Sequence, residues 1–192
     1  MTKFKIIALF GESSSGKDSI QNWIVNNMEN FYKTISITTR PPRDYERDGK
    51  DYFFVPQKTF KSYIEDHLML EYTCFNGWYY GTHKYTLIRN INNNINIGVF
   101  NPDGIRTLLT KSDIETLPVW IKVNDKIRLL RSLNREQNPN CEEICRRFLT
   151  DKEDFSNIEF DYEIFLNNSD KDNYHGFFNR PKIKEFINSK ND

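Results

Sequence analysis

The sequence predicts an α/β fold, with a parallel sheet of the P-loop NTPase type flanked by helices. Two observations carry this prediction. Short apolar runs alternate with segments of helical periodicity through most of the 192 residues, which is typical of parallel strands joined by helices. The first run also leads into a glycine-bracketed loop that carries a lysine. A chain of this length is expected to form one domain with room for small inserted subdomains.

The loop after the first predicted strand, residues 6–10, reads Gly11-Glu12-Ser13-Ser14-Ser15-Gly16-Lys17-Asp18. Its glycines allow backbone N–H groups to turn towards phosphate oxygens, and the N-terminus of the next helix adds a favourable dipole. That helix is indicated by the apolar residues Ile20, Trp23, Ile24 and Met28. We therefore expect a P-loop in which Lys17 reaches the β- and γ-phosphates. The alternative is a Gly/Ser-rich loop that binds nothing.

The elements that follow fall into two groups. A second strand is predicted at residues 32–38. From about residue 40 to residue 90 the pattern changes to short strands at 51–55, 70–75 and 78–80 with a helix at 58–66, which indicates a small mixed insertion. The parallel pattern then resumes with strands at 95–100, 118–123 and 163–166. Helices are predicted at 103–110 and 126–133, from about Glu142, and at the C-terminal end around Ile183, Phe186 and Ile187.

Composition and charge exclude several classes of protein. The formal net charge is zero, so no overall field favours nucleic acid or an anionic membrane. No apolar stretch is long enough to cross a bilayer and the N-terminus lacks a signal-peptide core, so we expect a cytoplasmic location. Cys74, Cys141 and Cys145 are expected to be free thiols, and the histidines are too scattered for a metal site.

A second group of polar residues lies in the predicted insertion. The segment Ser36-Ile37-Thr38-Thr39-Arg40-Pro41-Pro42-Arg43 is followed by Glu46, Gly49 and Asp51-Tyr52-Phe53-Phe54, and later by Glu71 and Gly77-Trp78-Tyr79-Tyr80-Gly81-Thr82. Two arginines beside prolines offer planar donor groups to a phosphate. Tyrosine hydroxyls add donors, and a carboxylate can accept from the donor edge of a base. On charge alone, a surface loop with solvated arginines is the alternative.

Together with the P-loop, this segment resembles guanylate kinase, whose signature runs STTRxPRxGExxGxDYxF and then ExxxxxGxYYG(S/T). The resemblance implies an ATP-dependent nucleoside monophosphate kinase that uses Mg²⁺ and phosphorylates GMP or dGMP. It also implies a single domain with three parts: a core at about 1–38, 93–130 and 155–192, a monophosphate-binding insertion at about 39–92, and a helical lid at about 131–154.

The resemblance also implies roles for individual residues. ATP would be bound by the loop and helix start, at Gly11, Ser13, Ser14, Ser15, Gly16, Lys17, Asp18 and Ser19. The acceptor phosphate would be held by Arg40, Arg43, Tyr52 and Tyr80, and the base read by Ser36, Glu71 and Thr82. Lys17, Arg43, Arg135 and Arg147 would act on the transferring phosphoryl group. A solvated basic helix face is the alternative for the two lid arginines.

Four positions depart from the family pattern. Glu12 replaces a usual proline, and Asp18 a Ser or Thr that offers its hydroxyl to Mg²⁺. Val99 replaces a carboxylate that helps to recognise guanine, and Asn101 an aspartate near the metal. Because one carboxylate is lost and one gained, we hypothesise that Mg²⁺ is held through Asp18, directly or through water, with Asn101 nearby. Unrelated drift at the two positions is the alternative.

These departures leave rival functions open. Loss of an acceptor for a buried donor costs about 1–3 kcal/mol, so a related (deoxy)nucleoside monophosphate kinase with another base preference, for example of the phage type, is the first alternative. The second is a non-catalytic guanylate-kinase-like domain that binds proteins, although such domains typically lack the phosphate-binding loop that this chain keeps. The expected partners are nucleotides, with no nucleic acid and no membrane, and the expected assembly is a monomer or a homodimer.

Overall fold

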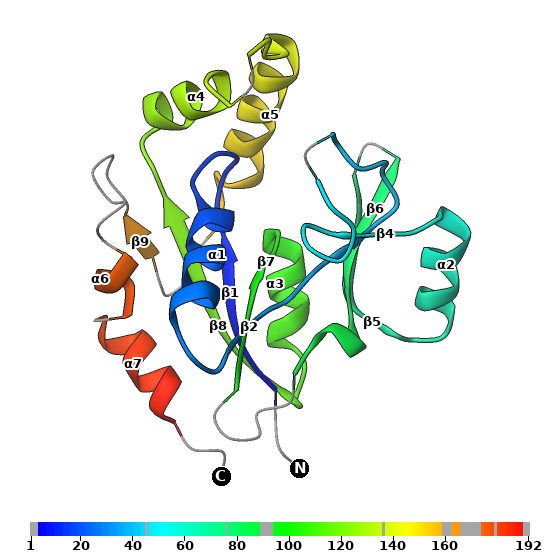
Figure 1. Ribbon diagram of the computed structural model, residues 1–192, viewed down its shortest axis with the longest axis vertical. Helices are drawn as coiled ribbons and strands as arrows, with labels where there is room; N and C mark the ends of the chain where they lie inside the picture. Colours follow the sequence, from blue (N-terminus) through cyan, green and yellow to red (C-terminus); the bar gives the residue numbers. More distant parts are fainter. Residues whose placement is uncertain are drawn as a thin grey trace.

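The computed structural model describes residues 4–44, 46–75, 77–88, 94–135, 137–158, 163–165, 174–178 and 180–189. The described strands form two sheets that lie side by side (Figure 1). The larger sheet is parallel throughout, with the strand order β2-β7-β1-β8-β9. Its strands are β1 (Phe4–Phe10), β2 (Phe31–Lys33), β7 (Ile95–Val99), β8 (Ile114–Lys122) and β9 (Glu163–Phe165). The expected parallel sheet is thus confirmed.

The smaller sheet is mixed and has the order β4-β3-β6-β5. Its strands are β3 (Ile37–Thr38), β4 (Phe53–Phe54), β5 (Met69–Phe75) and β6 (Trp78–His83). β3 runs parallel to β4 and antiparallel to β6, and β5 and β6 form an antiparallel hairpin. Helix α2 (Gln57–Glu65) packs on this sheet through Phe60, which is completely buried beside Ile37 and Met69. This unit has the small mixed character that the sequence predicts.

Helices cover both faces of the parallel sheet because its central strands are buried on both sides. Along β1, Ile7 and Leu9 point to the face covered by α1 (Lys17–Asn27), α6 (Tyr174–Phe178) and α7 (Pro181–Asn188). Ile6, Ala8 and Phe10 point to the opposite face, against α3 (Pro102–Leu109). Figure 1 shows α1 and α3 on opposite sides of the strands. The sheet therefore holds the loop after β1 rigidly at its carboxyl edge.

Two further helices lie beyond that carboxyl edge, over the loop after β1 (Figure 1). They are α4 (Asp125–Leu133) and α5 (Cys141–Asp154). Each begins at an asparagine whose side chain accepts a hydrogen bond from the first turn: Asn124 from the Lys126 N–H and Asn140 from the Glu143 N–H. The chain thus brings helices from positions after 124 over a loop that ends at position 16.

The structure corrects the element predictions at a few places. The segment 32–38 is not one strand: β2 ends at Lys33 and pairs with β7, whereas β3 begins at Ile37 and pairs in the smaller sheet. β8 begins four residues before the predicted strand, and α6 was not predicted. Leu166, the last residue of the predicted strand 163–166, lies outside the described residues. Helix α5 begins at Cys141, beside the predicted Glu142.

The three cysteines are free, as the sequence predicts, and the structure also shows them exposed. In the described part of the chain, no helix combines the length and the apolar character needed to span a bilayer.

Candidate active site

The loop between β1 and α1 has the backbone geometry of a phosphate-binding loop. Gly11 has φ 147°, and a Cβ there would come within 2.5 Å of the Ile121 carbonyl oxygen. Gly16 has φ 97°, a conformation that favours glycine. Helix α1 begins directly after Gly16, so the N–H groups of its first turn have no partners within the helix and face the loop. The loop, residues 11–16, will be called the P-loop.

Lys17 lies against the P-loop. Its Nζ donates hydrogen bonds to the carbonyl oxygens of Gly11 and Glu12, at 2.7 and 2.9 Å. Burial lowers the pKa of Lys17, and the carboxylates of Asp18 and Asp151 act in the opposite direction. The ammonium group is therefore held at the centre of the loop, where it can move onto phosphate oxygens.

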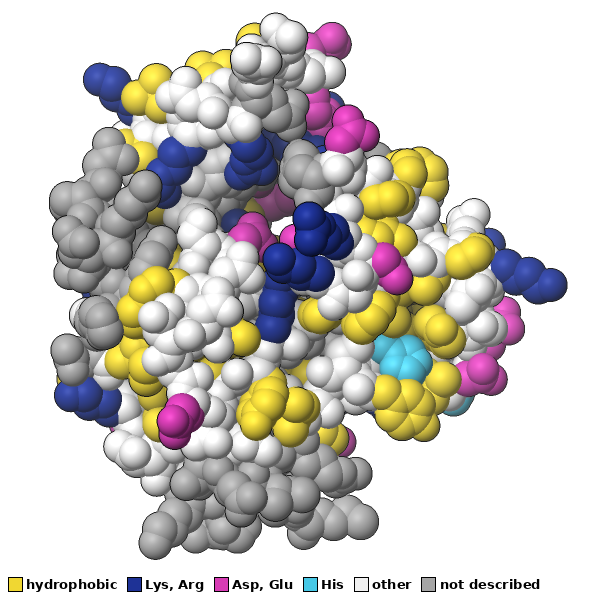
Figure 2. All heavy atoms as spheres, in the orientation of Figure 1, with side chains coloured by type: hydrophobic (Ala, Val, Ile, Leu, Met, Phe, Trp, Pro, Cys, Tyr) yellow, Lys and Arg dark blue, Asp and Glu magenta, His cyan; other side chains and the backbone are white. Residues whose placement is uncertain are grey.

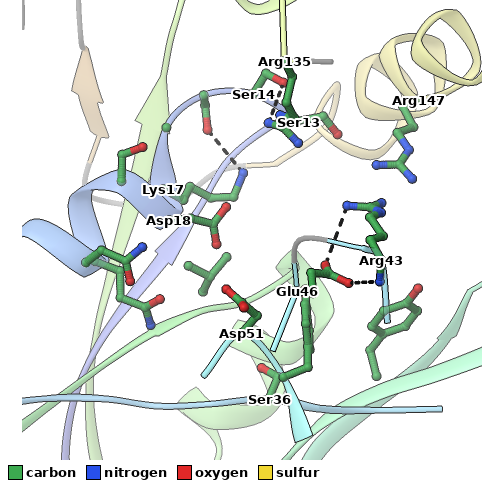
Figure 3. Close-up of a pocket in the computed structure, with 18 of the residues that line it drawn as sticks. Ser13, Ser14, Lys17, Asp18, Ser36, Arg43, Glu46, Asp51, Arg135 and Arg147 are labelled. Atoms are coloured by element: carbon green, nitrogen blue, oxygen red, sulfur yellow. Dashed lines mark hydrogen bonds and ion pairs between the residues drawn. The ribbon is translucent and has the colours of Figure 1, made fainter. Parts of the chain in front are cut away.

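One cavity of about 960 Å³ joins the P-loop, the smaller sheet and the two helices above. Figure 2 shows Lys and Arg side chains around this hollow. Of the residues predicted for the site, it is lined by Ser13, Ser14, Ser15, Gly16, Lys17, Asp18, Ser19, Ser36, Arg40, Arg43, Tyr52, Tyr80, Arg135 and Arg147. Gly11, Glu71, Thr82 and Asn101 are not in its lining. Two segments far apart in the sequence thus face one space (Figure 3).

Glu46 orients the two arginines of the smaller sheet's side of the cavity. Its carboxylate accepts hydrogen bonds from Nη1 and Nη2 of Arg40, at 2.7 and 2.5 Å, and from the backbone N–H of Arg43, at 2.8 Å. Burial acts to raise the pKa of Glu46, but the hydrogen bonds from Arg40 and Arg43 outweigh it and leave the pKa lowered. Glu46 stands in the quoted sequence pattern, yet only its contacts show what it does.

Aromatic rings pack beside these arginines. The guanidinium carbon of Arg40 lies 5.2 Å from the ring centroid of Tyr52, within the range of a cation–π interaction. The rings of Tyr52 and Tyr80 meet edge to face at 6.3 Å. Burial raises the pKa of Tyr52, and the charge of Asp18 adds to the effect. The hydroxyl group of Tyr52 therefore stays protonated and can donate a hydrogen bond to an anion.

Glu71 and Thr82 lie behind the cavity wall. Glu71 is 8% exposed, and its Oε1 accepts a 2.6 Å hydrogen bond from the Thr82 hydroxyl. Burial raises the pKa of Glu71 to about 7, although two hydrogen bonds from Thr82 act to lower it. A Cβ added at Gly104 would lie only 2.8 Å from Oε2 of Glu71, so the backbone of α3 packs closely against this carboxyl group. The carboxyl group is thus enclosed on the side of α3, and Val99 lies in the cavity wall.

Arginines in and directly after α4 point to the P-loop. Arg128 and Arg131 share one face of α4, and Arg135 lies two residues beyond the end of the helix at Leu133. Nη1 of Arg131 lies 3.4 Å from the carbonyl oxygens of Ser14 and Ser15, and Nη2 of Arg135 donates to the Ser14 hydroxyl at 3.2 Å. The predicted catalytic Arg135 is therefore at the loop, as Figure 3 shows.

Arg147 reaches the cavity from α5. Its Nε donates a 2.6 Å hydrogen bond to Oε1 of Glu143, one turn earlier. Glu143 also accepts two hydrogen bonds from Arg146, and these are the main cause that lowers its pKa to about 2. The carboxylate thus holds Arg147 by one edge of its guanidinium group. In Figure 3 the other edge faces Arg43 and the cavity.

The two residues proposed for a metal occupy different surroundings. Asp18 is exposed and lines the cavity. Asn101 uses its Oδ1 to accept a 2.7 Å hydrogen bond from the Gly104 N–H, which caps α3. Among the described residues, no cluster of three or more His, Cys, Asp or Glu side chains could hold an ion by protein ligands alone. This donor set fits a cation that keeps several waters and binds substrate phosphates, which is the habit of Mg²⁺.

Comparison with known proteins identifies the family. The family model described as guanylate kinase matches residues 3–179. The chain belongs to the guanylate kinase family. It is similar to the guanylate kinase of Prochlorococcus marinus (strain MIT 9312), at 31% identity over 87% of this chain and 91% of that protein. It is also similar to that of Wigglesworthia glossinidia brevipalpis, at 34% identity over all of this chain and 90% of that protein.

A solved guanylate kinase from Anaplasma phagocytophilum shares the fold, with a TM-score of 0.66 and 22% identity over 98% of this chain and 89% of that one. The resemblance seen in the sequence and the predicted fold class are thereby confirmed. The guanylate kinase family consists of nucleotide-binding phosphotransferases that use ATP, and the chain is an enzyme of that kind.

Sequence reasoning missed two groups that the structure brings to the site. Arg128 of α4 is buried against α5 and the P-loop. Asp151 of α5 lies against Ser13. The spacing of Arg128 to Arg131 on one face of α4 was a usable signal for the first. No local pattern marked Asp151.

Proposed function

We propose that this chain transfers the γ-phosphoryl group of ATP to GMP or dGMP, giving ADP and GDP or dGDP. The observation that carries the proposal is the single cavity shared by the P-loop and by Arg40, Arg43, Tyr52 and Tyr80. Its volume of about 960 Å³ lies at the upper end for ligand pockets. Membership of the guanylate kinase family supports the same activity.

The proposed mechanism is in-line transfer between two nucleotides that meet phosphate to phosphate. Lys17 and the P-loop N–H groups hold the donor phosphates, apart from the Ser13 N–H, which donates to Asp151. Arg40, Tyr52 and Tyr80 hold the acceptor phosphate. Arg43, Arg135 and Arg147 approach the same space from three separate segments of the chain and would stabilise charge on the transferring group. The acceptor is an ionised phosphate, so no general base is required and most of the catalysis is positioning. We propose the division into core, insertion (about 39–92) and lid (about 131–154) on the same grounds.

We propose that Mg²⁺ associates with Asp18, which faces the cavity beside Lys17 (Figure 3). A bound Mg²⁺ would neutralise charge on the donor phosphates. The Oδ1 of Asn101 already accepts a hydrogen bond from the Gly104 N–H, and its second lone pair is the one with which it could take part. Asp18→Asn should raise the Mg²⁺ concentration needed for half-maximal activity. Asp18→Ser should raise the same concentration by a smaller factor. Unchanged Mg²⁺ dependence in both would exclude Asp18 from this role.

Val99 puts an apolar side chain in the cavity wall, where the family pattern has a carboxylate that helps to recognise guanine. A panel of all ribo- and deoxynucleoside monophosphates with ATP tests the proposal directly. GMP or dGMP is expected to be the best acceptor. A clear preference for another base would replace the proposal by the alternative kinase, and absence of turnover with every acceptor would favour a binding protein. A sizing experiment in the same buffers distinguishes monomer from homodimer.

A further inference from the structure

Asp151 joins helix α5 to the P-loop. Its Oδ2 accepts a hydrogen bond from the backbone N–H of Ser13 at 2.7 Å, and its Oδ1 accepts one from the Ser13 hydroxyl at 3.3 Å. Both atoms of this carboxylate are thus directed at one residue of the loop, 138 positions earlier in the chain. A charge-assisted bond to a backbone N–H fixes a helix more firmly than a neutral contact does.

Arg128 holds the Asp151 carboxylate in this position. Its side chain is 2% exposed, and its Nη1 lies 3.2 Å from Oδ2 of Asp151 and 3.3 Å from the Ser13 carbonyl oxygen. Nη2 donates to Asp125 of α4 at 2.9 Å. One buried guanidinium group therefore connects α4, α5 and the P-loop. A buried arginine is costly unless it is paired, which favours a single arrangement of the three elements.

Asp151 and Arg147 lie four residues apart on α5, so their side chains share one face of the helix. Both line the cavity. A sliding or rotation of α5 that breaks the contact between Asp151 and Ser13 also moves Arg147, because the two side chains share one face of the same helix. The contact therefore helps to set where the guanidinium group of Arg147 stands relative to phosphates bound in the loop.

We propose that Asp151 is a positioning residue, which docks α5 on the Ser13 N–H and so places Arg147 at the transferring phosphoryl group. This inference rests on the proposed kinase function for its catalytic part. Its structural part, the docking of α5 on the P-loop, stands without it. Asp151 itself takes no part in the chemistry.

The kinetic test compares Asp151→Ala, Asp151→Asn and a matched control, Glu153→Gln, which removes a carboxylate from an exposed position of the same helix. A misplacement of about 1 Å can lower a rate by about 100-fold. We expect Asp151→Ala to lower kcat about 10- to 100-fold with KM for GMP changed less than about twofold. Asp151→Asn keeps an acceptor and is expected to recover part of the loss. Wild-type kcat in Asp151→Ala would overturn the proposal.

A double-mutant cycle separates positioning from a general structural role. If Asp151 acts through Arg147, then Asp151→Ala should cost less than about twofold in kcat when Arg147 is already alanine. Multiplicative losses in the double variant would overturn the proposal. If Asp151→Ala folds poorly, Asp151→Asn replaces it in the same double-mutant cycle with Arg147→Ala.

The docking is also measurable without activity, by hydrogen exchange of the Ser13 amide in the intact protein. We expect faster exchange in Asp151→Ala and unchanged exchange in Glu153→Gln, at equal thermal midpoints. Unaltered exchange at Ser13 would overturn the docking. Faster exchange in a chain without kinase activity would instead overturn the proposed function and leave the docking in place.

Discussion

Glu46 binds Arg40 through a two-pronged ion pair, in which both terminal guanidinium nitrogens donate to the two carboxylate oxygens. The same carboxylate accepts the backbone N–H of Arg43. One acidic side chain therefore fixes both the direction of the first arginine and the turn that presents the second. Bidentate pairing of this kind gives geometric specificity as well as energy.

Removing the charge of Glu46 should misorient both arginines. We expect Glu46→Gln to lower kcat/KM for GMP about 10- to 100-fold, since a hydrogen bond to a charged group contributes about 1.5–3 kcal/mol. Most of the change should appear in KM. The control is Asp44→Asn, an exposed carboxylate of the same loop. Equal kinetics for the two variants would show that Glu46 does not orient the arginines.

The raised pKa of Glu71 should make stability depend on pH. Burial raises this pKa to about 7, whereas a carboxyl group of an unfolded chain titrates near ~4.3. The folded state thus binds the proton more tightly, so its stabilising effect is complete below that lower value and is lost as the pH rises through about 7. We expect a loss of about 4 kcal/mol in the free energy of unfolding.

Urea unfolding between pH 4.5 and 8 measures this loss as a difference between the wild type and Glu71→Gln, in which the group cannot titrate. The slope should be steeper in the wild type. Parallel curves for the two proteins would contradict a raised pKa of Glu71.

Val99 should weaken the distinction between guanine and hypoxanthine, which lacks the 2-amino group. With a valine in the wall and no second carboxylate for that group, kcat/KM for GMP and IMP should differ less than about tenfold. Val99→Glu restores an acceptor and should widen the ratio by about 10- to 100-fold, which corresponds to about 1–3 kcal/mol. A wild-type enzyme that already rejects IMP by more than 100-fold would rule this out.

Lys5 should anchor the C-terminal helix. It is 1% exposed, and its Nζ donates to the Phe186 carbonyl oxygen at 2.9 Å, to the Ser189 hydroxyl at 2.8 Å and to the Ser189 carbonyl oxygen. Burial lowers the pKa of Lys5, and Glu115 opposes the shift. Because Lys5→Met leaves the end of α7 without these donors, we expect a loss of about 1–3 kcal/mol of stability.

Chemical unfolding compares Lys5→Met with Lys184→Met, which removes an exposed lysine from α7 itself. Proteolysis should also release the C-terminal segment faster in the first variant only. Equal stability of the two variants would mean that the buried lysine contributes nothing net.

The sequence was sufficient for the parts of the fold that local patterns encode. The apolar run before Gly11 and the periodicity after Lys17 predict β1 and α1 because burial on one or both faces leaves a clear signal. The same patterns could not divide residues 32–38 between two sheets. The division depends on distant partners: Ile97 accepts from the Thr34 N–H, and Ser36 accepts from the Phe53 N–H.

The site divides in the same way. Short motifs predicted the cavity residues of the P-loop and of the segment around Arg40 and Arg43, because each motif lies within one stretch of sequence. Asp151 and Arg128 were missed because each acts through a contact with Ser13, which lies more than a hundred positions away in the sequence. Asn96 is a further case: its amide binds the backbone of Lys5 and Ile88, which a run of asparagines does not reveal.

Ser14 adopts a left-handed backbone conformation, with φ 61°, which costs a residue with a side chain about 1–2 kcal/mol. Its hydroxyl is held by Ser132 of α4 and by Arg135, two residues after that helix ends, which offsets that cost. The shape of the nucleotide-binding turn is therefore conditional on a neighbour rather than built into the turn itself. A glycine at this position would adopt the same backbone conformation without those contacts, so the shape of the turn would no longer depend on α4.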